Sequence, residues 1–296
     1  MSSVEIVLSG LLISALRSAT PLLFALLGEC LTQRAGRINL GVEGQMLVGA
    51  ASGYGATAFT GSPWLGLLAG ALAGALLSLV YALLTVPAAA NPFASGLAVW
   101  MLAFGLSAYA GTGLVGLRIE GFEPLAWGLT PSIVLALALV PLIGLWLYRT
   151  RTGLRWRAVG ESPETARAAG IRPWAVIVSA IAVGGLLSGL GGAALSVDYT
   201  RTWAEGMTAG RGLVAVGLVI VARWNPWLAL PAALLFGGAE ALSLRLQAAD
   251  SAISAHLLHT LPYLTSLAVF AFTCLRLGAR RGDGGAPAGL KAVFEH

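Results

Sequence analysis

Apolar runs of about 20 residues recur along the whole length of this chain, which is the length a helix needs to cross a bilayer. Because lipid offers the backbone no hydrogen bonds, such runs must be helical. The composition of the 296 residues agrees: 57% are hydrophobic and 10% are charged, whereas a soluble domain carries about 25% charged residues. We therefore predict an all-α, polytopic helical membrane protein.

The runs predict about nine (8–10) transmembrane helices. They cover approximately residues 6–27, 45–60, 64–86, 92–115, 129–148, 174–197, 213–222, 226–246 and 258–275. The run at 213–222 is too short to span unless the glycine-rich segment before it also lies at membrane depth, where such backbone must be buried in protein or line a cavity. We predict a single transmembrane domain over residues 1–278 and a disordered cytoplasmic tail over 279–296.

Small residues recur at helical spacing in two of these spans. The two stripes are Gly66, Gly70 and Gly74, and Gly184, Ser188 and Gly192 with Gly185 and Gly189 beside them. Small residues let helix backbones approach closely in lipid. We therefore predict that these faces pack against neighbouring helices.

The stretch from Arg149 to Arg172 contains six arginines in the middle of an otherwise apolar chain. Its second part begins with Ser162, a favourable N-cap, and with Pro163, which suits the first helical position. Glu164 complements the positive helix end, and Gly170 can close the helix in a left-handed conformation. We predict a short helix at a membrane face that docks a cytoplasmic partner. A solvated loop between two spans is the alternative.

The distribution of arginines sets the predicted topology. Arg34 and Arg37, the stretch at 149–172, Arg223 and the cluster at 276–281 alternate with arginine-poor loops. Cytoplasmic loops of membrane proteins carry the excess of basic residues. The C-terminus is then cytoplasmic and, with nine spans, the N-terminus is outside. The same rule explains the net charge of +5 better than binding of nucleic acid does.

Ionisable groups within the spans are few. Arg17, Glu43 and Glu240 are the main cases, and Asn39 lies in the polar segment 28–44. Intramembrane charge is a functional candidate by default, although Arg17 could equally pair with a carboxylate or carbonyl on a neighbouring helix. A carrier driven by protons or sodium usually needs a chain of such groups. Their scarcity favours energy supplied from outside the chain.

The sequence lacks the motifs of a catalytic domain. It contains no G-x-x-x-x-G-K-[ST] loop, and its one lysine, Lys291, lies in the tail. It contains no H-E-x-x-H or G-x-S-x-G motif, and Cys30 and Cys274 fit no metal or disulfide spacing. We therefore predict no metal site, no cofactor on this chain and no catalytic residues, which leaves little support for an intramembrane enzyme.

Several segments together resemble the signatures of permease subunits of bacterial ABC importers. The branch is the one that serves nucleosides, simple sugars and branched-chain amino acids, and the short nucleoside-type members are most similar. The segments are residues 28–29 and 34–44, Asn91 with 95–97 and 105–107, 157–163 with Ala166, Ala169, Gly170 and Ile171, then 208–212, 225–226 and 235–237. They lie within residues 15–275. Gln33 and Arg37 depart from the pattern, in which an acidic and an apolar residue are common.

The resemblance implies that the short helix after Arg157 docks into an ATPase subunit. The implied coupling residues are Gly160, Glu161, Ser162, Pro163, Glu164, Ala166, Arg167 and Gly170. It also implies a second, different and longer permease chain, partner ATPase domains that bind ATP–Mg, an extracytoplasmic solute-binding protein and a location in the bacterial plasma (inner) membrane. The chain itself would be a non-catalytic transmembrane subunit.

Polar and aromatic residues at helix breaks are the candidates for lining the substrate path. They are Asn91, Phe93, Ser95, Trp100, Thr208, Gly210 and Arg211. Aromatic faces with neutral hydrogen-bonding groups suit a flat, uncharged, polar molecule, so we predict a nucleoside as the substrate. A simple sugar or a branched-chain amino acid is the alternative within the family. A secondary carrier or channel that works without ATP is the alternative from another class.

Overall fold

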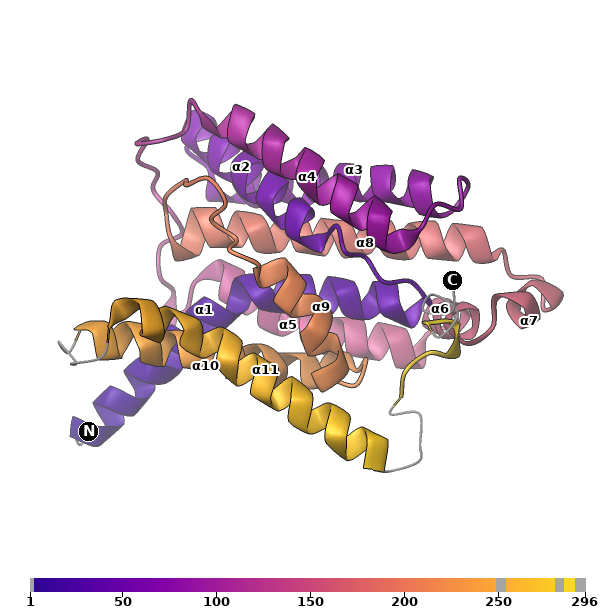
Figure 1. The fold of residues 1–296 in the computed structure, drawn as a ribbon. Helices are drawn as coiled ribbons and strands as arrows, with labels where there is room; N and C mark the ends of the chain where they lie inside the picture. The colour runs from indigo at the N-terminus through magenta and orange to yellow at the C-terminus, as the bar shows by residue number, and fades with distance from the viewer. Residues whose placement is uncertain (1–2, 249–253, 280–284, 291–296) are drawn as a thin grey trace.

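The structure is a computed structural model that describes residues 3–248, 254–279 and 285–290. Every regular element in these ranges is helical, as predicted (Figure 1). The helices are α1 (Ser3–Arg34), α2 (Val42–Thr60), α3 (Pro63–Thr85), α4 (Pro92–Gly111), α5 (Pro131–Arg149), α6 (Arg151–Glu161), α7 (Pro163–Ala168), α8 (Pro173–Ala193), α9 (Arg211–Val221), α10 (Pro226–Ala248) and α11 (Ala255–Ala279). Short helical turns are η1 (Ala126–Gly128), the π-helical η2 (Ala194–Tyr199) and η3 (Ala288–Leu290).

Seven helices of the described chain are long and apolar enough to cross a membrane: α1, α3, α4, α5, α8 with η2, α10 and α11. The predicted count of about nine also included α2 and α9, which fall outside this set. α2 is mostly buried and packs against α3, α4 and α8, so it needs little lipid-facing apolar surface. α9 has 11 residues, a length of about 16 Å, roughly half of the hydrocarbon core.

Proline marks where many of these helices begin. Helices α3, α4, α5, α7, α8 and α10 all start at a proline, whose missing N–H costs nothing at the first helical position.

Helix α1 continues to Arg34, beyond its predicted end near Leu27. Its polar residues are satisfied inside the protein, since Gln33 donates to the Glu29 carboxylate (2.9 Å) and accepts from the Trp224 indole (2.7 Å). They therefore do not end the helix.

The glycine stripes pack as predicted, because α3 and α8 meet along them and α2 closes against both. A Cβ built on Gly189 would lie 2.8 Å from the Cα of Gly74 and would overlap the carbonyl of Gly70. A Cβ on Gly49 of α2 would lie 2.6 Å from the Cα of Gly189. The backbones of α2, α3 and α8 are therefore in direct contact at these glycines, with no side chains between them.

We expect Gly189→Val to lower the thermal unfolding midpoint of the purified protein in detergent by several degrees. Overpacking of this kind costs typically about 1–3 kcal/mol, and here the opposing atoms are backbone, which cannot swing aside. Gly238→Val on α10 is the matched control, because a Cβ at Gly238 meets nothing within 4 Å. Equal unfolding midpoints for the two variants would contradict the close packing of α3 and α8.

The two ends of the helix bundle differ in the segments they carry (Figure 1). The elements α6, α7 and η3 gather at one end, whereas the connections from α4 to α5 and from η2 to α9 lie at the other. The arginine-rich stretch is therefore opposite the loop that contains Glu120, in keeping with the predicted alternation. We take the α6–α7 end as cytoplasmic by the distribution of arginines.

The prediction of a disordered tail does not hold for residues 285–290. Leu290 is only 5% exposed and belongs to the main hydrophobic core. Pro287 is buried as well. Burial of these two apolar side chains offsets the entropy of ordering the segment. Residues 280–284 and 291–296 of the predicted tail lie outside the described residues.

Candidate functional site

A polar turn lies immediately before α9. Gly210 has a left-handed φ of 85° at the N-cap of this helix. The Glu43 carboxylate, from the first turn of α2, accepts hydrogen bonds from the Thr208 hydroxyl (2.5 Å) and from the backbone N–H groups of Gly210 (2.8 Å) and Gly212 (2.7 Å). An anion at a helix N-terminus is electrostatically favourable. Because Glu43 is only 3% exposed, its carboxylate fixes the start of α9 to α2.

The next residue of the turn, Arg211, forms an ion pair with Glu240 of α10. The same carboxylate accepts hydrogen bonds from the hydroxyls of Ser18 on α1 and Tyr199 on η2 (3.2 Å for Tyr199). The Arg211 guanidinium lies 5.5 Å from the centre of the Tyr199 ring. Both predicted intramembrane carboxylates thus have partners, as buried charges in a membrane usually do.

The turn is also held from α11, because the Tyr263 hydroxyl donates to the carbonyl of Ala209 (2.7 Å). Sequence analysis missed Ser18, Tyr199 and Tyr263 as members of this site. All three are hydroxyl-bearing residues in long apolar helices, with no neighbouring motif that could have identified them. Their role is visible only once α1, η2 and α11 meet α10 and the turn.

The remaining polar candidates lie apart from the turn. Arg17 lines a cavity of about 270 Å³ together with Ser14 and Tyr199. Asn39 is fully buried in the connection between α1 and α2, where its side chain donates to Gln45 (3.1 Å) and accepts from the N–H of Gly41 (3.1 Å). These bonds shape the connection that leads into α2.

The other predicted path residues lie on α4. Asn91 caps this helix by accepting hydrogen bonds from the N–H groups of Phe93 (2.9 Å) and Ala94 (3.2 Å), and Ser95 is buried one turn later. The buried indole N–H of Trp100 has no hydrogen-bond partner within the described structure. An unpaired buried donor is unusual, and it commonly marks a place for a ligand or water.

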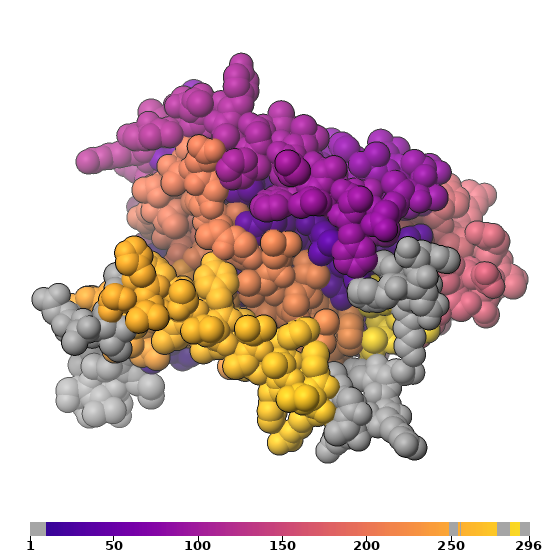
Figure 2. All heavy atoms as spheres, viewed as in Figure 1, coloured from indigo at the N-terminus to yellow at the C-terminus, as the bar shows by residue number. Residues whose placement is uncertain are grey.

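The structure places the backbone of Trp100 against the first turn of α2, the helix that carries Glu43. A Cβ on Gly44, the residue after Glu43, would lie 3.0 Å from the Cα of Trp100. Asn91 and Phe93 lie instead nearer the α7 end, where Phe93 and Val216 of α9 line a cavity of about 360 Å³. α9 is seen recessed between α4 and α11 in Figure 2. The predicted path residues therefore lie between the turn and the end of the bundle that carries α6 and α7.

The short polar helix predicted after Arg157 is present as α7, and its predicted caps are confirmed. The Ser162 hydroxyl accepts a hydrogen bond from the N–H of Thr165 (3.2 Å), and Pro163 is the first helical residue. Gly170 has a φ of 78°, and the N–H of Ile171 donates to the carbonyl of Ala166 (3.0 Å). This is the bonding of a left-handed helix end.

The side chains of α7 divide into an anchor and an exposed surface. Ala166 is buried, whereas Glu164 and Arg167 are exposed, as is Glu161 at the end of the preceding helix. The preceding helix, α6, was not predicted. Its start does carry a local signal, because the Thr150 hydroxyl accepts from the N–H of Gly153 (3.0 Å) as an N-cap.

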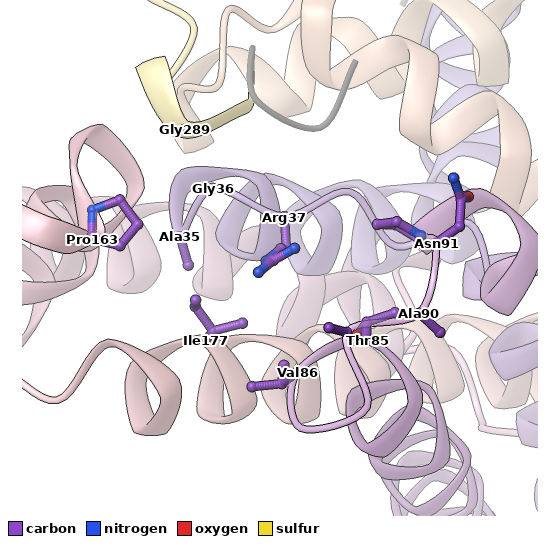
Figure 3. Close-up of a pocket in the computed structure, with 12 residues that line it drawn as sticks. Ala35, Gly36, Arg37, Thr85, Val86, Ala90, Asn91, Pro163, Ile177 and Gly289 are labelled. Atoms are coloured by element: carbon purple, nitrogen blue, oxygen red, sulfur yellow. The ribbon is translucent and has the colours of Figure 1, made fainter. Parts of the chain in front are cut away.

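A cavity of about 530 Å³ lies beside α7 (Figure 3). It is bordered by the α1–α2 connection, the α3–α4 connection, the start of α7 and η3. Arg37 points into it, and Asn91, Pro163 and Gly289 lie around it. The first residue of α7 and the residue that caps α4 thus border one space.

The sequence of this chain is similar to those of known transport proteins. Residues 11–270 match a family described as the permease component of branched-chain amino acid transport systems. A putative glucose ABC transporter permease of Haloferax volcanii is 36% identical over 90% of this chain and 92% of its own length. A guanosine ABC transporter permease of Bacillus subtilis is 31% identical over 80% of this chain and 83% of its own. A nucleoside ABC transporter permease of Lactococcus lactis is also 31% identical, over 80% of this chain and 81% of its own. No solved structure matches the chain.

The family match covers most of the chain, including the polar turn and α7. The three relatives, at 31–36% identity, cover 80–90% of this chain. The chain therefore belongs to the ABC transporter permeases, as a non-catalytic transmembrane subunit.

Proposed function

We propose that this chain forms part of the path by which an ABC importer moves a small, neutral, polar solute, foremost a nucleoside. The observation that carries the proposal is the polar turn at Thr208–Gly212. Its charges are compensated within the protein, since Glu43 binds the turn and Arg211 pairs with Glu240. What remains for a solute is mostly neutral: backbone groups, aromatic faces and the unpaired indole N–H of Trp100, together with the Nη1 group of Arg211, which has no hydrogen-bond partner among the described residues.

Neutral donors and aromatic surfaces suit nucleosides better than amino acids. A zwitterionic amino acid would want compensating charges along its path, and the charges at this turn already have partners. The guanosine and nucleoside permeases among the relatives support this choice. A hexose is the second candidate, because the relative named for glucose shares 36% identity over nearly the whole chain.

The rest of the assembly follows from the same proposal. α7 docks an ATPase subunit through its exposed charged surface, and ATP–Mg binds to that partner. A second, different permease completes the path, and an extracytoplasmic binding protein delivers the solute. The chain lies in the plasma membrane with its C-terminus in the cytoplasm, and α2 and α9 also lie at membrane depth. Because α9 alone reaches only about half of the hydrocarbon core, it completes a ninth crossing together with the segment before it.

Uptake of labelled solutes by the complete complex tests the substrate. We expect saturable uptake of uridine or adenosine, less of ribose or glucose, and none of leucine. Uptake should stop when ATP is depleted while the proton gradient is kept intact. Strong uptake of leucine alone would refute the substrate class. Uptake by this chain without any ATPase subunit would instead favour a secondary carrier.

A further inference from the structure

The described part of the C-terminal tail packs against the junction between α6 and α7. The backbone N–H of Ala288 donates to the carboxylate of Glu161, the last residue of α6 (3.2 Å). Leu290 inserts into the same core cluster as Ala35 of the α1–α2 connection and Trp156 of α6. The segment is thus attached by one polar contact and one buried apolar side chain.

Three glycines from distant parts of the chain meet at this place: Gly36, Gly160 and Gly289. A Cβ on Gly289 would lie 2.6 Å from the carbonyl oxygen of Gly160 and 3.7 Å from the Cα of Gly36. A Cβ on Gly36 would lie 3.3 Å from the Cα of Gly160. A Cβ on Gly160 would overlap the carbonyl oxygen of Arg34, the last residue of α1. The three backbones therefore touch without side chains between them.

The position of this contact links the two parts of the proposed site. Gly160 lies two residues before Ser162, the N-cap of α7. Gly36 lies in the connection from α1 to α2, and Glu43 in the first turn of α2 binds the turn before α9. Close-packed interiors have low compressibility and transmit strain. A displacement of α7 would therefore reach the α1–α2 connection through rigid backbone contacts.

We propose that residues 285–290 are a brace for coupling: they hold the α6–α7 junction against the end of α1, so that movement of α7 is passed to α2 and the polar turn. Gly289 and Leu290 are its positioning residues. Without residues 285–290, the backbone of Gly160 contacts only the end of α1. The α6–α7 junction can then move away from α1 when α7 is displaced. The proposal rests on the proposed docking role of α7.

Two truncations of the full complex test the brace. A chain that ends at Gly284 lacks the segment but keeps Arg280 and Arg281, whereas a chain that ends at Ala292 keeps it. We expect the first to insert normally and retain basal ATP hydrolysis, but to lose solute uptake and its stimulation by loaded binding protein by roughly fivefold or more, the range typical of coupling between sites. The second should behave as the full chain. Equal uptake by both truncations would overturn the proposal.

A cross-link provides a readout that does not depend on removing the segment. We place Glu161→Cys with Ala288→Cys in a chain that also carries Cys30→Ala and Cys274→Ser. A short bifunctional methanethiosulfonate reagent can bridge the two thiols, since the contact between Ala288 and Glu161 runs through the length of the glutamate side chain. If the segment is a brace, this cross-link should leave uptake at the level of the protein without the cross-link. Loss of uptake on cross-linking, regained with reductant, would mean that the segment must release during transport. That result would refute the brace.

Failure of the brace and failure of the docking role can be told apart. If substitutions on the exposed surface of α7 abolish stimulation of the ATPase but the chain ending at Gly284 works normally, α7 docks and the brace is wrong. If those substitutions have no effect, the docking role itself fails. Gly289→Val adds an independent variant, because its side chain would press on the Gly160 carbonyl. It should reproduce the loss of stimulation without truncation.

Discussion

Glu43→Ala is expected to reduce uptake to below about a tenth of the wild-type rate, because the turn at Thr208–Gly212 loses its acceptor. The carboxylate accepts three hydrogen bonds, two of them from backbone N–H groups at the start of α9. Each buried donor left without a partner costs about 1–3 kcal/mol, and about 1.4 kcal/mol already corresponds to a factor of ten. We expect the turn to rearrange and the thermal unfolding midpoint to fall.

Glu43→Gln removes the negative charge of the side chain but keeps its size and shape, so it tests the contribution of the charge alone. The amide keeps one acceptor oxygen but turns an NH₂ group towards donors, because all three partners of Glu43 donate. We expect a partial loss, between the wild type and Glu43→Ala. Glu205→Ala is the matched control, since Glu205 is exposed in the segment that leads to the turn. If Glu43→Ala matches Glu205→Ala in both uptake and unfolding midpoint, the turn does not depend on the carboxylate.

Substitutions on α7 should uncouple transport from ATP hydrolysis while the protein still inserts. Glu164→Lys reverses the charge in the first turn of the helix, where a negative side chain is favoured. Gly170→Val forces a branched side chain to adopt a φ of 78°, and left-handed backbone costs a non-glycine residue roughly 1–2 kcal/mol. For both variants we expect uptake and substrate-stimulated ATP hydrolysis to fall by roughly fivefold or more.

Each α7 variant has a conservative control. Glu164→Gln removes the charge without reversing it, and Gly170→Asn keeps a residue that tolerates the left-handed conformation. A Cβ at Gly170 meets nothing within 4 Å, so any effect of valine there comes from the backbone and not from a clash. Membrane levels and basal ATP hydrolysis should match the wild type in all four proteins. Normal uptake by the Glu164→Lys and Gly170→Val variants would contradict the proposal that α7 docks the ATPase subunit.

Local sequence was sufficient for the membrane class, for many helix starts and for α7. Ser162, Pro163 and Gly170 act on backbone groups a few residues away, so their spacing alone predicts the helix and its caps. The glycine stripes on α3 and α8 likewise predict close packing, because only small side chains allow it. These features could be predicted from the sequence because each depends on residues nearby in the chain or on the periodicity of one helix.

Tertiary structure decided the features that depend on partners distant in sequence. Glu43 binds groups that lie 165 to 169 residues further along the chain, and no local pattern specifies such a pairing. The continuation of α1 through Glu29 and Gln33 depends on Trp224, which donates a hydrogen bond to the glutamine from the connection between α9 and α10. Residues 285–290 are Gly, Ala, Pro, Ala, Gly and Leu, a composition typical of a linker, yet Leu290 is buried in the core cluster that also contains Ala35 and Trp156. The composition of a segment indicates how much conformational entropy is lost, on average, when the segment becomes ordered. Whether burial of apolar surface compensates for that loss depends on the individual contacts that the fold provides.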